Sequence, residues 1–249
     1  MQGLVLTSAN NLTELLGSMR ANRIPLLKIV TGWGVHWNSD AINQICSMPS
    51  LLVRTVSGDG KPLHPQTVLD EIAPFYAVRP QIQIELGNEP NSTDASDDAA
   101  WLFRWWFIET VKAVRERYPL ARIVSPGLIE NRQETWWRIN QDAFSMADSI
   151  GFHAYAFFDF TSTDTGQLQR ALQLLGAIFP HKPWLGTELG INDMATPPST
   201  KATRYGTLHR KLPSQVAAAV WYHFCDQPLD ADQRAYQLPT SAFDELRSN

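Results

Sequence analysis

Cysteine is scarce in this sequence, and so are several other features that would indicate a class of protein at once. The 249 residues include only two cysteines, Cys46 and Cys225. Two cysteines cannot build a disulfide framework or a zinc cage of their own, so both are expected to be small buried residues. No stretch approaches the ~20 apolar residues of a membrane-spanning helix. The N-terminal stretch also lacks the basic and apolar regions of a signal peptide.

An excess of charge of one sign is missing as well. Lys and Arg number 21 against 25 Asp and Glu, which gives a net charge of −4, and no basic run interrupts this balance. Nucleic acid and anionic membrane surfaces are therefore not expected as partners. The chain as written is expected to be cytoplasmic, or secreted if a leader was removed. The sequence does not indicate an oligomeric state.

Glycine-rich phosphate-binding motifs are the third absence. Neither GxGxxG nor GxxxxGK follows any apolar run of the sequence, which disfavours a nucleotide-binding sheet. No cofactor and no bound metal are expected.

What the sequence does contain is a regular alternation of short apolar runs and longer polar segments with helical spacing. Hydrophobic residues make up 44% of the chain, enough for a large core. The apolar runs span 3–8, 25–32, 51–57, 82–90, 121–127, 149–157, 183–191 and 217–224. Alternation of this kind is typical of parallel strands with helices packed outside. Eight repeats in this length predict an α/β fold, a single (β/α)8 TIM barrel with one domain over residues 1–249.

Two of these runs end in a glutamate. In QIQIELGNEP, residues 81–90, strand alternation places Glu85 and Glu89 on one face, opposite the isoleucines. In PWLGTELGI, residues 183–191, the same rule places Glu188 with Trp184 and Gly186. Strand ends of a barrel meet at its C-terminal rim, where active sites lie. Because the fourth and seventh strands lie nearly opposite each other, Glu89 and Glu188 can flank one substrate bond.

Charged residues on neighbouring strands are the candidate partners of Glu85. Lys28 on the second strand and Arg54 on the third have the parity that faces the barrel axis. An unpaired carboxylate at that depth would be costly, so Glu85 is predicted to bind Arg54 or Lys28 in a structural ion pair.

Aromatic and histidine side chains complete the predicted site. SIGFHAYAF, residues 149–157, places His153 and Tyr155 on one face beside Glu188. On the last strand, Ala217, Ala219 and Trp221 share a parity, which predicts that Trp221 closes the top of the barrel with an apolar plate.

Several other tryptophans occur in helices and loops of this sequence. Trp33 and Trp37 follow the second strand, and we expect them to contact substrate. Trp136 and Trp137 follow the fifth strand and could form subsites or fill the space between helices and barrel. For Trp105 and Trp106, inside a long helix, packing is favoured.

Together, NEP at the fourth strand, HAY at the sixth and TELG at the seventh resemble retaining glycoside hydrolases of clan A, such as the cellulase-like family five. The resemblance covers nearly the whole chain in strand order. It implies that Glu89 is the acid/base and Glu188 the nucleophile.

The resemblance also implies roles for four other residues. Asn88 would bind the sugar 2-hydroxyl, and Tyr155 would orient Glu188. Arg54 would keep the nucleophile ionised, and Trp221 would form the platform at the cleavage point. One departure is the extra histidine that many family five members carry after the third strand, for which His36 and His64 are the candidates.

Three functions remain open from the sequence. The first is a retaining β-glycosidase acting on a neutral oligosaccharide or polysaccharide by double displacement. The second is a sugar-binding barrel that has lost catalysis, and the third is a metal-dependent barrel hydrolase. The metal-dependent hydrolase would need His or Asp pairs at several strand ends, and only His153 and His223 are available.

Overall fold

The computed structural model describes residues 1–6, 12–32, 35–56, 61–155, 166–190, 200, 205, 208 and 212–221. The strands are β1 (Gln2–Leu6), β2 (Leu26–Gly32), β3 (Ser50–Val56), β4 (Gln83–Leu86), β5 (Arg122–Val124), β6 (Ile150–Tyr155), β7 (Trp184–Gly190) and β8 (Val216–Trp221). The helices are α1 (Leu12–Ala21), α2 (Ser39–Cys46), α3 (Pro65–Val78), α4 (Asp97–Arg117), α5 (Gln133–Ile139), α6 (Gln141–Ser145) and α7 (Gly166–Ile178).

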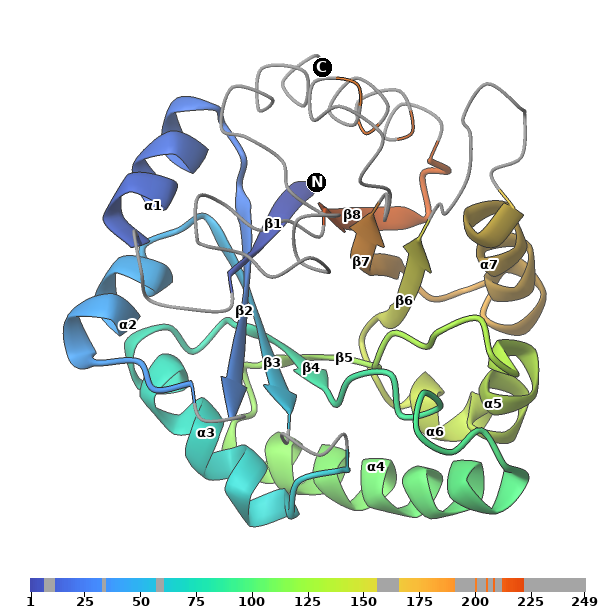
Figure 1. Ribbon diagram of the computed structural model, residues 1–249. Coiled ribbons are helices and arrows are strands. Elements are labelled where there is room, and N and C mark those ends of the chain that lie inside the picture. Colours follow the sequence, from blue (N-terminus) through green and yellow to red (C-terminus); the bar gives the residue numbers. More distant parts are fainter. Residues whose placement is uncertain are drawn as a thin grey trace.

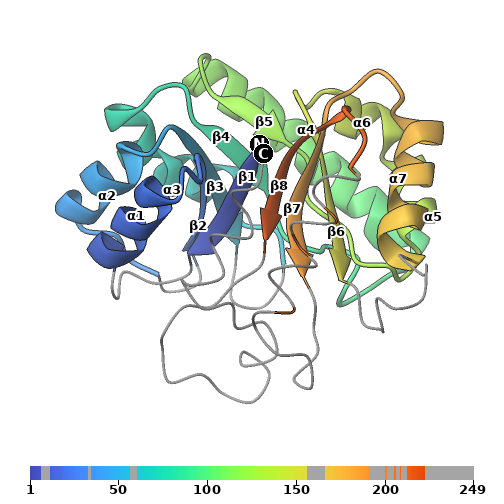
Figure 2. The ribbon, with the colours of Figure 1, turned by 90° about the horizontal axis from the view of Figure 1, so that it is seen from above.

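The eight strands form one parallel sheet that curls into a nearly closed barrel. Their order is β5-β4-β3-β2-β1-β8-β7-β6, so strands consecutive in the chain lie side by side and β1 pairs with β8. A parallel bridge between Val124 and Ser149 joins β5 to the start of β6. Figure 1 shows the strands in the centre with helices around them, and in Figure 2 the strand arrows point to the same side. The predicted (β/α)8 TIM barrel is confirmed.

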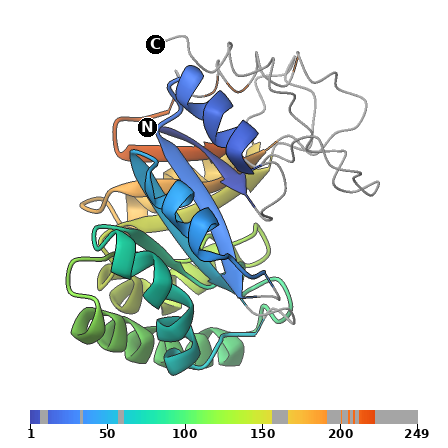
Figure 3. The ribbon, with the colours of Figure 1, turned by 90° about the vertical axis from the view of Figure 1, so that its left-hand side faces the viewer.

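Local signals in the sequence explain where the helices begin. The Asn38 side chain accepts from the Ala41 N–H at 2.8 Å and caps α2, and Ser96 accepts from the Ala99 N–H at 3.2 Å and caps α4. Pro65 occupies the first turn of α3, where its missing N–H costs nothing. The helices α1 to α3 lie against the outer side of the first strands (Figure 3, blue to teal). Among the described residues no helix has the length and apolarity needed to cross a membrane.

Two apolar clusters separate the inside of the barrel from its outside. The inner cluster contains residues from six strands, which can meet only at the barrel axis: Val5, Leu26, Leu52, Val124, Leu185, Ala218 and Val220. The outer cluster lies between the strands and helices and includes Leu27, Val53, Ile84 and Phe152. This division confirms the parity predicted for β2, β3 and β6.

The parity predicted for β8 is wrong. Ala218 and Val220 belong to the inner cluster, whereas Ala219 and Trp221 belong to the outer one. Alternation alone could not decide this, because the strand AAAVW is apolar on both faces and either parity satisfies burial. Trp221 therefore stacks on Tyr205, with ring centroids 4.6 Å apart, and is 1% exposed.

Simple alternation also fails at the ends of β4 and β7. Strand β4 ends at Leu86, and Gly87 and Glu89 both have positive φ, 90° and 42°. On β7 the pairing shifts between Gly186 and Leu189, so Trp184 packs outside while Glu188 faces the site. Both glutamates reach the rim, but a turn and a bulge place them there rather than a regular strand.

Candidate active site

Glu89 lies in a strained turn directly after β4. A φ of 42° is left-handed, a conformation that costs a non-glycine residue energy and is found mainly where surrounding contacts enforce it. Its backbone N–H donates to the Gly127 carbonyl at 3.1 Å, which ties this turn to the end of β5. Its side chain is 20% exposed and contacts His153 Nδ1 through Oε1 at 2.6 Å. Glu89 is thus held by neighbouring strands yet reachable from solvent.

Glu188 is almost fully buried and surrounded by donors. Its Oε1 binds the Arg54 guanidinium and lies 3.5 Å from Lys28 Nζ, and its Oε2 accepts from the Tyr155 hydroxyl. Burial raises the pKa of this carboxyl, but Arg54, His153, Lys28 and the Tyr155 hydroxyl together lower it to about 2. Glu188 is therefore ionised at neutral pH, as a nucleophile must be.

The two carboxylates face each other across a short gap. An oxygen of Glu89, a ring nitrogen of His153 and an oxygen of Glu188 all lie within 4.8 Å of one another. Retaining glycosidases hold their carboxyl groups about 5–5.5 Å apart and inverting ones about 6.5–9.5 Å, the larger gap leaving room for water. With one oxygen of each no more than 4.8 Å apart, the pair lies on the short, retaining side of this division.

His153 has a hydrogen-bond partner on each ring nitrogen, Glu89 on Nδ1 and Arg54 on Nε2, and its Nδ1 also lies 3.8 Å from Glu188 Oε2. Burial lowers its pKa, whereas Glu188, Glu85 and Glu89 raise it more, so its pKa lies above the ordinary value of 6.5. Arg54 opposes protonation of Nε2, because its Nη2 lies 2.9 Å from that nitrogen and can only donate a hydrogen bond. That contact favours an unprotonated Nε2, with the proton on Nδ1 donated to Glu89 Oε1.

Below these groups lies a buried network of ionic side chains. Arg54 binds Glu85 with two nitrogens, at 2.9 and 3.0 Å, and Lys28 Nζ lies 2.9 Å from Glu85 Oε2. The prediction that Glu85 pairs with Arg54 or Lys28 is confirmed, and it pairs with both. Burial raises the pKa of Glu85, but Arg54 and Lys28 outweigh this and hold it well below the usual range. Two cations and two carboxylates thus balance each other at 0–7% side-chain exposure.

The other predicted substrate-binding residues are placed unevenly. Asn88 is half-buried beside Glu89, and its Oδ1 is buried without a hydrogen-bond partner within the described part of the chain. Trp37 is half-buried and donates to the Val30 carbonyl at 3.1 Å. Trp33 lies outside the described residues.

The structure contradicts the role expected of Trp221 and decides two questions that the sequence left open. Trp221 is covered in the described structure, so its ring offers no stacking surface there. His36 is exposed, and His64 caps α3 by accepting from the Gln66 N–H at 3.2 Å. Neither histidine forms a hydrogen bond or an ion pair with Glu89 or Glu188 within the described residues. Trp136 and Trp137 are buried between helices and barrel, so packing rather than a subsite explains them.

Glu89, His153 and Glu188 are close enough together to surround a cation. Their donor atoms are already used, however, since Glu188 binds Arg54 and Tyr155 and both nitrogens of His153 have partners. A divalent ion would also meet the positive charge of Arg54. The donor set fits a metal poorly.

Comparison with known proteins gives structural matches only. No protein-family model matches the sequence, and no curated protein matches it significantly. A family 39 glycoside hydrolase from Bacteroides cellulosilyticus WH2 matches with a TM-score of 0.65 at 12% identity, over 98% of this chain and 61% of that one. A GH128 subgroup II endo-β-1,3-glucanase from Sorangium cellulosum matches with a TM-score of 0.67 at 14% identity, over 99% and 97%.

A third structure is a GH5 xyloglucan-specific endo-β-1,4-glucanase from a metagenomic library, in complex with cellotriose. It matches with a TM-score of 0.67 at 11% identity, over 94% of this chain and 85% of that one. The chain shares the fold of clan A glycoside hydrolases. The resemblance inferred from NEP, HAY and TELG is thereby confirmed at the level of the fold, and at these identities the catalytic roles rest on the geometry alone.

Two residues of this barrel contribute to the candidate site in ways the sequence did not indicate. The sequence predicts Lys28 only as a partner of Glu85, but Lys28 also donates to the Thr187 carbonyl at 2.8 Å and so supports the backbone at Glu188. Gly127 donates to Glu85 Oε1 at 3.3 Å and accepts from Glu89. In the sequence, the position of Gly127 directly after Ser125-Pro126, at the end of a strand, is the feature that could have indicated this role.

Gly127→Ala is expected to lower kcat by about 10²-fold with little effect on the overall fold. A Cβ on Gly127 would lie 2.0 Å from Cδ2 of His153, so the ring that holds Glu89 must move. Displacing a catalytic group by ~1 Å can cost about 10²-fold. Steady-state kinetics on an activated glycoside measures this, with circular dichroism as the folding check.

Gly17→Ala is the matched control for that substitution. Gly17 is exposed in α1 and a Cβ there meets nothing within 4 Å. This variant should keep full activity and gain about 0.4–1 kcal/mol of stability. Equal activity of the two alanine variants would show that His153 does not need its present position.

Acidification is expected to destabilise the fold between about pH 4.5 and pH 2. The pKa of Glu188 is about 2 against an ordinary 4.5, and that of Glu85 also lies well below 4.5. Because both are lowered on folding, their stabilisation is fully present above the unfolded value and is lost as the pH falls through the folded one. Urea unfolding over this range measures the slope, which Glu188→Gln should reduce; an unchanged slope would contradict the assignment.

Proposed function

We propose that this chain is a retaining glycoside hydrolase that cleaves β-linked bonds in neutral oligosaccharides or polysaccharides. The observation that carries the proposal is the pair of carboxylates, Glu89 and Glu188, with oxygens within 4.8 Å. The mechanism gives the two carboxylates different roles, and their surroundings differ as well. Glu188 is buried against Arg54 and Tyr155, and Glu89 is partly exposed and bound to His153.

The first step forms a covalent intermediate. Ionised Glu188 attacks the anomeric carbon, and the bond from that carbon to the glycosidic oxygen breaks. Glu89 gives its proton to the departing oxygen, so the leaving group departs as an alcohol. Tyr155 and Arg54 hold the attacking carboxylate in one orientation, which limits the entropy lost on reaching the transition state.

The second step releases the sugar. Glu89, now ionised, takes a proton from a water molecule whose oxygen attacks the anomeric carbon, and Glu188 leaves as a carboxylate. Two inversions restore the original anomeric configuration. Asn88, whose Oδ1 has no hydrogen-bond partner within the described residues, is the residue we assign to the hydroxyl next to the reacting carbon.

A neutral substrate fits the charges at the site. Lys28 and Arg54 are each paired with carboxylates, so neither is left to bind an acidic sugar. Several barrels with this fold are named for neutral β-glycans: endo-β-1,3-glucanases, a xyloglucan-specific endo-β-1,4-glucanase and a mannanase. Some contain oligosaccharides in their structures, laminaritriose and cellotriose among them.

The test is a panel of 4-nitrophenyl β-glycosides and neutral polysaccharides, including laminarin, xyloglucan and galactomannan. We expect cleavage of at least one, with early product of retained β configuration by proton NMR. Product of the α configuration would overturn the proposed mechanism. Binding without cleavage by folded protein would instead support the catalytically silent barrel.

Adding a chelator distinguishes the proposed glycosidase from a metal-dependent hydrolase. EDTA should leave the rate unchanged, because carboxylates and an arginine supply the chemistry. Loss of activity with EDTA and its recovery with a divalent ion would favour the metal-dependent hydrolase instead.

A further inference from the structure

Helix α4 presents two tryptophans to solvent. Trp101 is 48% exposed and Trp105 is 64% exposed. Four residues apart on a helix, they lie on one face about 5–6 Å from each other. The sequence favoured packing for Trp105, and that expectation is wrong, because the opposite face of α4 packs inward through Phe103 and Phe107. Neither exposed indole is explained by the core.

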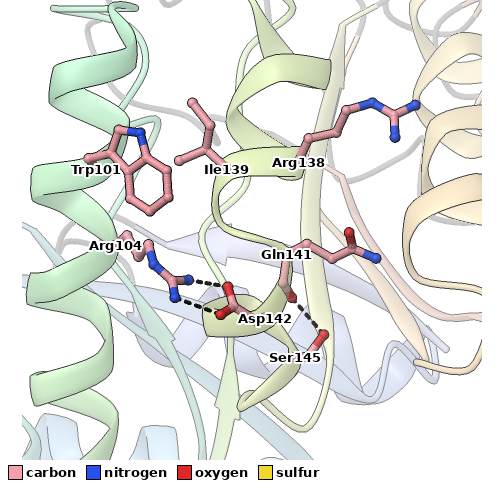
Figure 4. Close-up of a pocket in the computed structure, with 7 residues that line it drawn as sticks. All are labelled: Trp101, Arg104, Arg138, Ile139, Gln141, Asp142 and Ser145. Atoms are coloured by element: carbon pink, nitrogen blue, oxygen red, sulfur yellow. Dashed lines mark hydrogen bonds and ion pairs between the residues drawn. The ribbon is translucent and has the colours of Figure 1, made fainter.

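A hollow of about 770 Å³ opens beside Trp101 on the flank of the barrel. It is lined by side chains of α4, of the end of α5 and of α6, with Arg104 of α4 bound to Asp142 of α6 and the Gln141 amide pointing away from Trp101 (Figure 4). Its volume lies within the range of about 300–1,000 Å³ that is usual for small-molecule sites. An aromatic plane therefore borders a space with several hydrogen-bonding groups.

The charges around this hollow are already neutralised. Arg104 binds both carboxylate oxygens of Asp142, the Nη2–Oδ2 contact being 2.6 Å. Arg138 pairs with Glu134, its Nη2 lying 2.8 Å from Oε1. With both arginines paired, an anion finds no unpaired cation among these residues. The hollow suits a neutral polar ligand.

The Trp101 ring is held in place before any ligand binds. The Arg104 guanidinium carbon lies 5.5 Å from the ring centroid, a cation–π contact. The bidentate bond to Asp142 in turn fixes Arg104. A ring ordered in advance loses less entropy on binding than a free one.

We propose that this hollow is a second carbohydrate-binding site, in which a neutral sugar stacks on Trp101 and hydrogen-bonds to the polar side chains of α4 and α6. The choice of a glycan as the ligand rests on the proposed function. Sugars combine apolar C–H faces with hydroxyl groups, which matches an indole beside polar groups without net charge.

The site lies within reach of a long substrate. Helix α4 begins at Asp97, eight residues after Glu89, and Trp101 is in its second turn. Trp101 is therefore on the half of the barrel that carries the strand ends. A polymer is long enough to contact both the Glu89–Glu188 pair and this hollow, whereas a single glycoside can occupy only one of the two places. The second site thus predicts an effect that depends on substrate length.

A protein partner is the competing occupant. Leu102, beside the tryptophans on α4, is 72% exposed but does not line the hollow. A protein interface would bury Leu102 together with the indoles, whereas sugar stacking requires only the ring. Leu102→Ala is therefore the matched control for Trp101→Ala.

The experiment measures retention of the protein in gels containing laminarin, xyloglucan or galactomannan, in a Glu188→Gln background that cannot consume them. Trp101→Ala should weaken binding to one of these polymers about tenfold. Trp101→Phe should retain part of the binding, and Leu102→Ala should retain all of it. Equal retention of Trp101→Ala and the parent, or an equal loss in Leu102→Ala, would overturn the proposal.

Kinetics in the active protein distinguishes this site from the site at Glu89 and Glu188. Trp101→Ala should raise KM for the polymer and leave kcat/KM for a 4-nitrophenyl glycoside unchanged. Sedimentation of both alanine variants is the second readout, and a shift from dimer to monomer would overturn the proposal in favour of an interface. If the polymer binds through Trp101 but wild type cleaves nothing, the proposed function fails while the second site stands.

Discussion

Glu188→Gln is expected to lower kcat by about 10⁴-fold or more, about 5.5 kcal/mol of transition-state stabilisation at 1.36 kcal/mol per tenfold. The amide cannot form the glycosyl intermediate, so the reaction loses its two-step route. Arg54 and Tyr155 would remain in place, because the amide oxygen can still accept from either, and the fold should persist with lower stability, since the buried network loses one carboxylate. Stopped-flow kinetics with an aryl glycoside measures the loss.

The partner substitution Glu89→Gln should behave differently, and the difference assigns the two roles. An acid/base contributes about 10²–10⁴-fold, but a strongly activated leaving group departs without a proton. Glu89→Gln should therefore form the intermediate almost normally from a 2,4-dinitrophenyl glycoside and then stall at hydrolysis. The same behaviour from Glu188→Gln would reverse the assignment. Glu109→Gln, on the exposed surface of α4, is the isosteric control and should change nothing.

Glu85→Gln is expected to have the largest effect on stability, about 3–5 kcal/mol. It leaves Lys28 and Arg54, both buried, with Glu188 as the remaining carboxylate of the network. Breaking a buried pair by removing one partner is more destabilising than replacing both. Urea denaturation at neutral pH measures the change.

The double variant Lys28→Met/Glu85→Gln tests whether charge balance is the cause. Removing one charge of each sign leaves Arg54 paired with Glu188, and the amide oxygen introduced at position 85 can still accept from Arg54. The double variant should therefore be more stable than Glu85→Gln alone, with a coupling energy of at least about 1 kcal/mol in the cycle. Strictly additive losses would show that the network acts by packing rather than by charge.

Much of the site could be predicted because its residues belong to short local patterns. Glu89 and Glu188 each close an apolar run, and His153 and Tyr155 alternate along another. In a parallel barrel every strand ends at the same rim, so residues far apart in the chain meet there. Pairing of Glu85 followed from the cost of an isolated buried charge.

The errors have a common physical origin. Alternation assigns faces only while the strand stays regular and its two faces differ in polarity. On β8 both faces are apolar, and the pairing with β1 and β7 selects the parity, which places Trp221 outside. At Glu89 and Glu188, a positive φ and a shifted register override the alternation.

The amino-acid sequence alone thus determines the local structure. It indicates which segments become strands, which become helices, and which acidic residues lie at strand ends. Backbone geometry and apolar periodicity act over a few residues, so they can be inferred without coordinates. Distances across the barrel belong to the folded molecule, because they depend on how eight strands pair. Only there do Lys28, Arg54 and His153 come together with three glutamates, and only there do two indoles of α4 remain outside the core.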